Sequence, residues 1–172
     1  PFTGGVRRVT NSSRKAKALW NILDRSGVRS HVVNWFASHP AEPVDGVIVS
    51  DAFNKPASFR THSTSAAPGS VYPPSLEENL AELRMDAREL TAEDLAPFVP
   101  DLRRIDQSRD RRLVPLAVSL ASAITAHAVT TWILENESWR FVAVCYEAIE
   151  QVCRHFMRYY PPRMDDVSEE DF

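Results

Sequence analysis

Glu150, Arg154 and His155 are the residues of this chain whose types and spacing come closest to metal chemistry. Carboxylates and imidazoles are common ligands of divalent metals. Here they follow a short apolar run, residues 141–145, that predicts a buried strand. In an open α/β sheet, ligands bind at the carboxyl ends of the strands. The segment Trp139–Pro162 is therefore the first place to expect a site.

The spacing on the predicted helix limits what these side chains can do. Glu150 and His155 are five residues apart, so a regular helix rotates them by about 140° and they cannot share one metal without distortion. Glu150 and Arg154 are four apart and share a face. The alternative to a metal site at Glu150 and His155 is therefore an exposed ion pair of little energetic weight.

Other candidate residues carry weaker signals. Asp51 ends the apolar run GVIVS, where a carboxylate serves equally well as a ligand or as a turn former. His39 lies near Glu42 in a Pro-containing loop, whereas His31, His62 and His127 are more typical of structural histidines. The chain has no Gly-rich phosphate loop, no Cys-x-x-Cys and no His-Glu-x-x-His.

Alternating helical and strand patterns must position these residues, and they predict an α/β fold. We expect a helix from Ser12 or Ser13 to Ser26, strands over 31–36 and 46–50, a buried helix over 108–135, and then the strand and helix of the opening segment. Residues 51–74 lack periodicity and predict an irregular excursion. Capping-box signatures at Ser75 with Glu78 and at Thr91 with Asp94 predict two short helices.

Composition sets further bounds. The 172 residues with 44% hydrophobic content predict one domain with a sizeable core, and the net charge of -3 gives no reason to expect nucleic-acid binding. The basic residues of the first thirty positions form either a solvated helix face or an anion-binding patch. There is no run of about 18 apolar residues and no signal peptide, which favours a cytoplasmic protein without a membrane segment. Cys145 and Cys153 predict buried thiols rather than a disulfide framework.

Four segments together resemble the bacterial type I phosphodiesterase/nucleotide pyrophosphatase branch of the alkaline phosphatase superfamily. They are RKAKALWNIL (14–23), VVNWFASHPAEPVDGVIVSDAF (32–53), YPPSLEENLAELRM (72–85) and AVCYEAIEQVCRHFMRYYPPR (143–163). The resemblance implies a partial alkaline-phosphatase-like three-layer α/β/α core over residues 1–172, with an irregular and mostly helical insertion over 51–135.

Enzymes of this family use two divalent metals, commonly zinc, and a Thr or Ser nucleophile to cleave phosphate esters. Their Asp and His ligands, four residues apart, fall on Glu150 and Arg154 when the following FM and PP are aligned. Arg cannot ligate a metal, and His155 lies one residue too late. The nucleophile is expected upstream of Pro1 and the second ligand set downstream of Phe172.

Two functions follow from the resemblance. The first is a fragment of a metal-dependent phosphodiesterase or phosphatase that acts on phosphate esters but is not catalytic as this chain alone. Pro1 in place of a methionine, and a helix-start signature at Ser168 and Asp171, also indicate a fragment. The alternative is a pseudoenzyme or protein-interaction domain that keeps the fold without a metal site. An incomplete sheet would favour self-association.

Overall fold

The computed structural model describes residues 9–55 and 66–169, and by its internal contacts the chain forms two compact units. The first unit comprises residues 1–84 and 126–145, and the second comprises 85–125 and 146–172. Helix α4 (Leu113–Asn136) contributes residues to both. The predicted α/β class is confirmed by a four-stranded mixed sheet with helices.

The sheet of the first unit has the strand order β3-β2-β1-β4. Its strands are β1 (Ser30–Val33), β2 (Ile48–Val49), β3 (Val71–Tyr72) and β4 (Phe141–Val144). β1 is central and pairs in parallel with β2 and with β4, whereas β3 pairs antiparallel with β2. The carboxyl ends of three strands therefore meet at one edge of the sheet.

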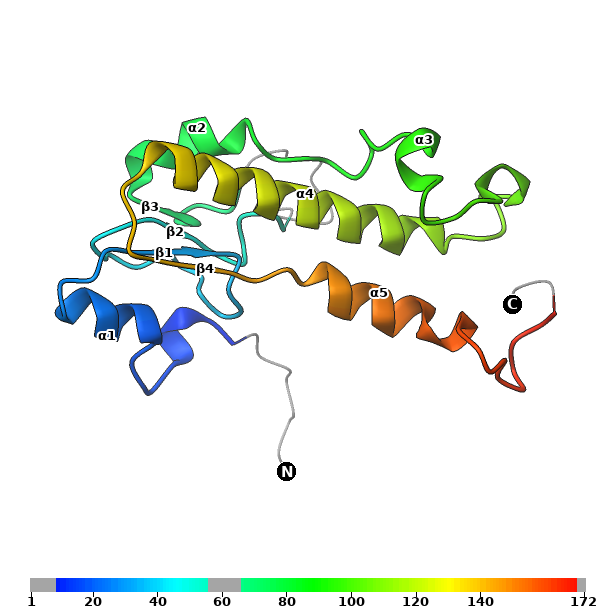
Figure 1. Ribbon diagram of the computed structural model, residues 1–172, viewed down its shortest axis with the longest axis horizontal. Coiled ribbons are helices and arrows are strands. Elements are labelled where there is room, and N and C mark those ends of the chain that lie inside the picture. The colour runs from blue at the N-terminus through cyan, green and yellow to red at the C-terminus, as the bar shows by residue number, and fades with distance from the viewer. Residues whose placement is uncertain (1–8, 56–65, 170–172) are drawn as a thin grey trace, which may run out of the picture. The chain divides into compact units, whose positions relative to one another are not determined.

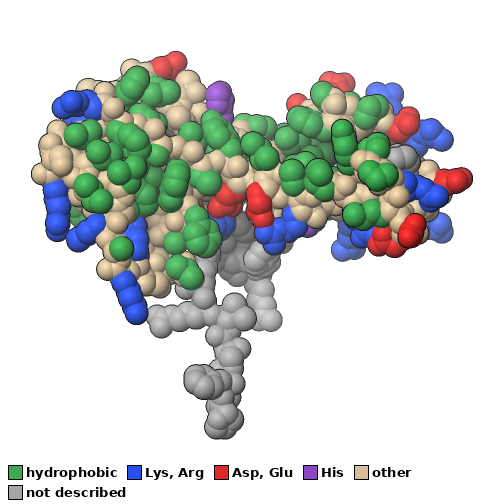
Figure 2. All heavy atoms as spheres, turned by 60° about the horizontal axis from the view of Figure 1, so that its bottom comes forward, with side chains coloured by type: hydrophobic (Ala, Val, Ile, Leu, Met, Phe, Trp, Pro, Cys, Tyr) green, Lys and Arg blue, Asp and Glu red, His purple; other side chains and the backbone are tan. Residues whose placement is uncertain are grey.

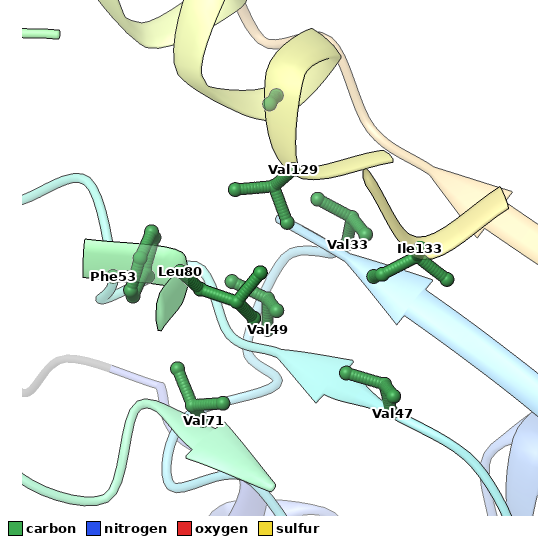
Figure 3. Close-up of a cluster of buried hydrophobic side chains, with 9 residues drawn as sticks. Val33, Val47, Val49, Phe53, Val71, Leu80, Val129 and Ile133 are labelled. Carbon is green, nitrogen blue, oxygen red and sulfur yellow. The ribbon is translucent and has the colours of Figure 1, made fainter. Parts of the chain in front are cut away.

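Apolar side chains cover both faces of this sheet. Since neighbouring residues of a strand point to opposite faces, Val33 and Val49 pack on one side while Val32 and Ile48 pack on the other. Helix α1 (Leu19–Arg25) covers the Val32 face through Trp20, and helix α2 (Glu77–Ala81) with the last part of α4 covers the Val33 face, as Figure 1 shows. Figure 3 shows the cluster on the second of these faces, formed by Val33, Val47, Val49, Phe53, Val71, Leu80, Ala126, Val129 and Ile133.

Helix α1 begins at Leu19 and not at Ser12 or Ser13, so the predicted start was wrong. Residues Asn11–Ser13 instead form a 3-10 turn, η1. The side chain of Asn21 accepts a hydrogen bond from the N–H of Ala18 and so marks the start of the helix. The side chain of Asn11 donates a hydrogen bond to the carbonyl oxygen of Pro40, 29 residues away. The guanidinium of Arg14 donates to the carboxylate of Glu42, 28 residues away. A helix-start pattern covers only a few neighbouring residues, so it cannot predict hydrogen bonds between residues so far apart in the sequence.

Of the other predicted elements, the structure confirms some and corrects others. The strand at β4 and the capping box of Thr91 with Asp94, which opens α3 (Ala92–Leu95), are confirmed. Pro115 lies in the first turn of α4, where a proline is tolerated. Ser75 caps no helix, because Pro74 opens a 3-10 turn, η2 (Pro74–Leu76), that contains it. β3 lies in the stretch predicted to be irregular, and His62 lies outside the described residues.

Two features fix β1 against Gly46 and Val47, the residues just before β2. His31 is fully buried, and its Nδ1 accepts a hydrogen bond from the N–H of Val47 at 2.9 Å. The ring is therefore the neutral tautomer with the proton on Nε2, which donates to the carbonyl oxygen of Ser138 at 3.0 Å. Next to it, Gly46 has φ +147°, and a Cβ on that residue would lie 1.9 Å from the carbonyl oxygen of Ser30.

The second unit has its own apolar core. Leu95 of α3, Leu102 of the 3-10 turn η3 (Leu102–Arg104) and Leu113 and Leu116 of α4 are its buried members. Helix α5 (Ala148–Phe156) packs Val152 and Phe156 against them. The last turn of the unit, η4 (Met157–Tyr159), places the Tyr159 ring 5.1 Å from the guanidinium carbon of Arg112.

By length and composition alone, α4 could cross a membrane. An 18-residue window of this helix has a mean hydropathy of 1.6, and 44% of that window is buried in the protein. Its residues Val129 and Ile133 belong to the core of the first unit and Leu113 and Leu116 to that of the second. The expectation of no membrane segment stays a prediction.

Large apolar side chains also remain on the surface. Phe36 is 66% exposed and Ile149 is 72% exposed, and apolar side chains are visible between charged ones in Figure 2. Single exposed apolar residues are normal in globular proteins. These exposed side chains therefore do not test the expected self-association, which stays a prediction.

Candidate functional site

The loops that follow the parallel strands bring polar side chains together at the carboxyl edge of the sheet. We call these residues the strand-end cluster; its members are Asn34, Ser38, His39, Ser50, Asp51 and Lys55. Asn34 directly follows β1, and its side-chain amide donates to the carbonyl oxygen of Cys145, which directly follows β4, at 3.0 Å. The ends of β1 and β4 are thereby fixed to each other at the place where an α/β sheet binds its ligands.

Asp51 is the centre of the cluster, and only 3% of it is exposed. Its Oδ1 accepts from the N–H of His39 at 3.1 Å, and its Oδ2 lies 3.3 Å from the ammonium of Lys55. Its own N–H donates to the hydroxyl of Ser38 at 3.0 Å. The carboxylate thus joins the turn after β2 to the loop after β1, which favours the turn-forming interpretation of Asp51.

His39 is half-buried and faces the end of β2. Its Nδ1 lies 3.3 Å from the hydroxyl of Ser50, a residue with no exposed surface. The imidazole and the Lys55 ammonium, which is 39% exposed, can both donate to an anion. The pairing of His39 with Glu42 suggested by the sequence is not formed, since Glu42 bonds Arg14 and Trp20 instead.

The backbone of the loop after β1 is strained. Asn34 has φ +56° and Ala37 has φ +55°, both in the left-handed region. Asn tolerates this conformation, whereas for Ala it costs about 1–2 kcal/mol. Such strain persists only where surrounding contacts determine the conformation, and here the bonds of Asn34 and Ser38 to their neighbours do so. The loop is held in one defined shape.

The Glu150 and His155 positions lie in the second unit, on α5. The Glu150 carboxylate accepts from the Arg154 guanidinium in an exposed ion pair. His155 is exposed, and its ring contacts that of Phe156 edge to face, with 6.3 Å between centroids. The alternative that the sequence left open, an ion pair of Glu150 with Arg154, is the contact that forms.

These residues do not fit a divalent metal. The guanidinium that binds Glu150 is a permanent cation with no lone pair to offer. In residues 9–55 and 66–169, no group of three or more His, Cys, Asp or Glu side chains could hold a metal ion. We therefore derive no chemistry through a metal at this position.

Neither cysteine forms a disulfide bond, and the expectation of two buried thiols was wrong. Cys145 is half-buried at the end of β4, whereas Cys153 is exposed on α5.

We expect Asp51→Ala to lower the free energy of unfolding by about 1–3 kcal/mol, because the N–H of His39 and the Lys55 ammonium lose their acceptor. Lys55→Gln should cost less, because that side chain is partly exposed. Urea titration followed by tryptophan fluorescence measures both. The control is Asp45→Ala, which removes an exposed carboxylate 3.9 Å from Arg29. Equal losses at positions 45 and 51 would contradict the anchoring role of Asp51.

Comparison with known proteins found no match of this chain to a family model, to a curated protein or to a solved structure.

Proposed function

We propose that this chain is part of a phosphodiesterase-like protein of the alkaline phosphatase superfamily, acts on phosphate esters in that context, and is not catalytic by itself. The observation that carries the proposal is the strand-end cluster. It lies at the carboxyl edge of a largely parallel sheet, where a phosphate ester is expected to bind in such a fold. The segment 32–53, which supports the resemblance, supplies its residues from Asn34 to Asp51.

The side chains of the cluster are suited to bind an anion but not to attack it as a nucleophile. Lys55 and His39 can donate to phosphate oxygens, while Asp51 holds the two loops that carry them. The hydroxyl of Ser50 is fully buried, so it is badly placed to act as a nucleophile. Zinc, in the intact protein, would polarise the ester and activate the nucleophile, but the residues at positions 150 and 154 do not support binding it.

A second candidate is a pseudoenzyme or protein-interaction domain that keeps the fold without a metal site. The observation that favours it is the ion pair of Glu150 with Arg154, at the two positions where the resemblance expects metal ligands. The arginine at position 154 repels a cation and binds the carboxylate of Glu150.

Zinc binding by the purified chain tests the second candidate, which has no metal site. We expect the purified chain to bind no stoichiometric zinc and not to turn over bis-p-nitrophenyl phosphate, because Arg154 neutralises Glu150. Arg154→His removes that cation and places a carboxylate and an imidazole four residues apart, so it should raise zinc affinity by about tenfold or more. Elemental analysis and isothermal titration calorimetry measure the change.

The matched control is Arg158→His, which makes the same exchange at a residue that binds Asp166 instead of Glu150. If wild-type protein binds zinc stoichiometrically and Glu150→Ala abolishes that binding, the pseudoenzyme candidate is wrong. If Arg154→His gains no more affinity than Arg158→His, the assignment of position 154 as a former ligand position fails.

A further inference from the structure

A pocket of about 320 Å³ lies beside α1 in the first unit and shares no residue with the strand-end cluster. Its walls come from the segment before α1, from α1 itself and from the loop after β1; the lining residues are Asn11, Ser12, Arg14, Lys15, Ala16, Lys17, Asn21, Pro40 and Glu42. The N–H of Asn11 donates to the carbonyl oxygen of His39 at 2.7 Å, and its side chain donates to that of Pro40 at 3.0 Å. These bonds hold one wall against the other.

The lining of this pocket is positively charged. Arg14, Lys15 and Lys17 stand against the single carboxylate of Glu42, which leaves an excess of two positive charges. Burial raises the pKa of Glu42, but hydrogen bonds from Trp20, Arg14 and Asn21 outweigh burial and bring that pKa below its ordinary value. Glu42 is thus ionised, and its Oε1 lies 2.6 Å from Trp20 Nε1 and 2.7 Å from Arg14 Nη2.

Arg14 is fixed in place while the two lysines are not. Its Nη2 donates to Glu42 and, at 3.1 Å, to Asn21, and its guanidinium carbon lies 5.1 Å from the centre of the Trp20 ring. Its Nε and Nη1 donors take no part in these bonds. Lys15 and Lys17 are exposed, and neither has a hydrogen bond or ion pair within the described segments. A preorganised guanidinium and two exposed ammonium groups in the lining of one pocket are suited to phosphate oxygens.

The size of the pocket restricts the ligand. Small-molecule sites in proteins occupy about 300–1,000 Å³, and this pocket lies at the lower limit. The excess of two positive charges matches a phosphate dianion or a pyrophosphate better than a monocarboxylate. A small phosphate-bearing anion fits both the charge and the volume.

We propose that this pocket binds a small polyanion with one or two phosphate groups, with Arg14 as the fixed contact and Lys15 and Lys17 closing over the ligand. The site goes beyond the proposed function, because it shares no residue with the strand-end cluster or α5. It assigns three of the basic N-terminal residues, Arg14, Lys15 and Lys17, to an anion site instead of a solvated helix face.

Titration calorimetry with inorganic pyrophosphate and, separately, inorganic phosphate tests the site at low ionic strength, where exposed charges are least screened. We expect saturable binding at one site, weakened about tenfold or more in the double variant Lys15→Gln with Lys17→Gln. The control is Arg25→Gln with Arg103→Gln, which removes the same charge from exposed residues outside the pocket. It should change affinity by less than about twofold.

Both lysines are exposed, so the double variant should fold, and circular dichroism confirms this. Tighter binding of pyrophosphate than of phosphate would indicate a diphosphate ligand, and the reverse order a single phosphate; either order supports the site. No saturable binding by the wild type would overturn the proposal. Equal weakening in the two double variants would also overturn it, because it would show attraction to net charge without a pocket.

Discussion

Gly46→Ala should lower the free energy of unfolding by more than about 4 kcal/mol, enough to unfold a large fraction of the protein. The added Cβ would lie 1.9 Å from the carbonyl oxygen and 2.8 Å from the carbonyl carbon of Ser30. Those atoms are backbone at the first residue of β1, paired with Phe141 of β4, so they cannot move without breaking the sheet. Far-UV circular dichroism and urea titration measure the loss.

Gly27→Ala is the matched control for that substitution. Gly27 also has a positive φ, +67°, but a Cβ there would meet no atom within 4 Å. Only the backbone conformation penalises this alanine, by about 1–2 kcal/mol. A loss at Gly46 no larger than the loss at Gly27 would show that the contact with Ser30 is not what requires glycine.

His31→Leu should lower the free energy of unfolding by about 2–5 kcal/mol, because it leaves the Val47 N–H and the Ser138 carbonyl without partners inside the protein. His31→Gln should lose less, since an amide can accept from one group and donate to the other. Guanidinium titration at pH 7.5 ranks the two variants. A leucine variant as stable as the glutamine variant would contradict the role of the two bonds.

The same histidine should make stability depend on pH. Burial lowers the pKa of His31 below its ordinary value, against the opposing effect of its bond to Ser138, and the charge of Arg29 lowers it further. The unfolded chain therefore takes up a proton near pH 6.5, while the folded protein does not. Stability contributed by neutral His31 is complete above about pH 6.5 and falls as the pH decreases toward the folded-state pKa.

Comparing wild type with His31→Gln isolates this contribution from that of the carboxylates. The wild type should lose more stability between pH 7 and pH 5.5 than His31→Gln does. Parallel curves for the wild type and His31→Gln would show that His31 does not titrate differently on folding.

The sequence is sufficient to predict the central strands because each is buried on both faces. Val32, Val33, Ile48 and Val49 are 0–1% exposed, so a parallel strand here appears as an uninterrupted apolar run. β3 has two residues and lies after a Ser- and Pro-rich stretch, so neither length nor alternation marks it. Its existence depends on pairing with β2, a tertiary contact.

The candidate site is predictable at one residue and not at the others. Asp51 can be found because a carboxylate ends an apolar run, and the structure places it at the centre of the strand-end cluster. Ser38 gives no comparable signal, since its role depends on a bond between two loops. Lys55 contacts Asp51 locally, four residues along the chain, but no helical pattern surrounds the pair to indicate it. For Glu150 and Arg154, helical spacing alone predicts the pair that forms.

The contacts of Trp20 give this protein an optical reporter. The indole N–H is bonded to a carboxylate, a guanidinium lies over the ring, and the residue is 5% exposed. Trp35 and Trp139 are 43% and 51% exposed, so a soluble quencher reaches them far more easily. Emission that survives acrylamide is therefore weighted toward Trp20 and the half-buried Trp132. A shift in it on addition of an anion, lost in Trp20→Phe, would follow the environment of Arg14 and Glu42 in real time.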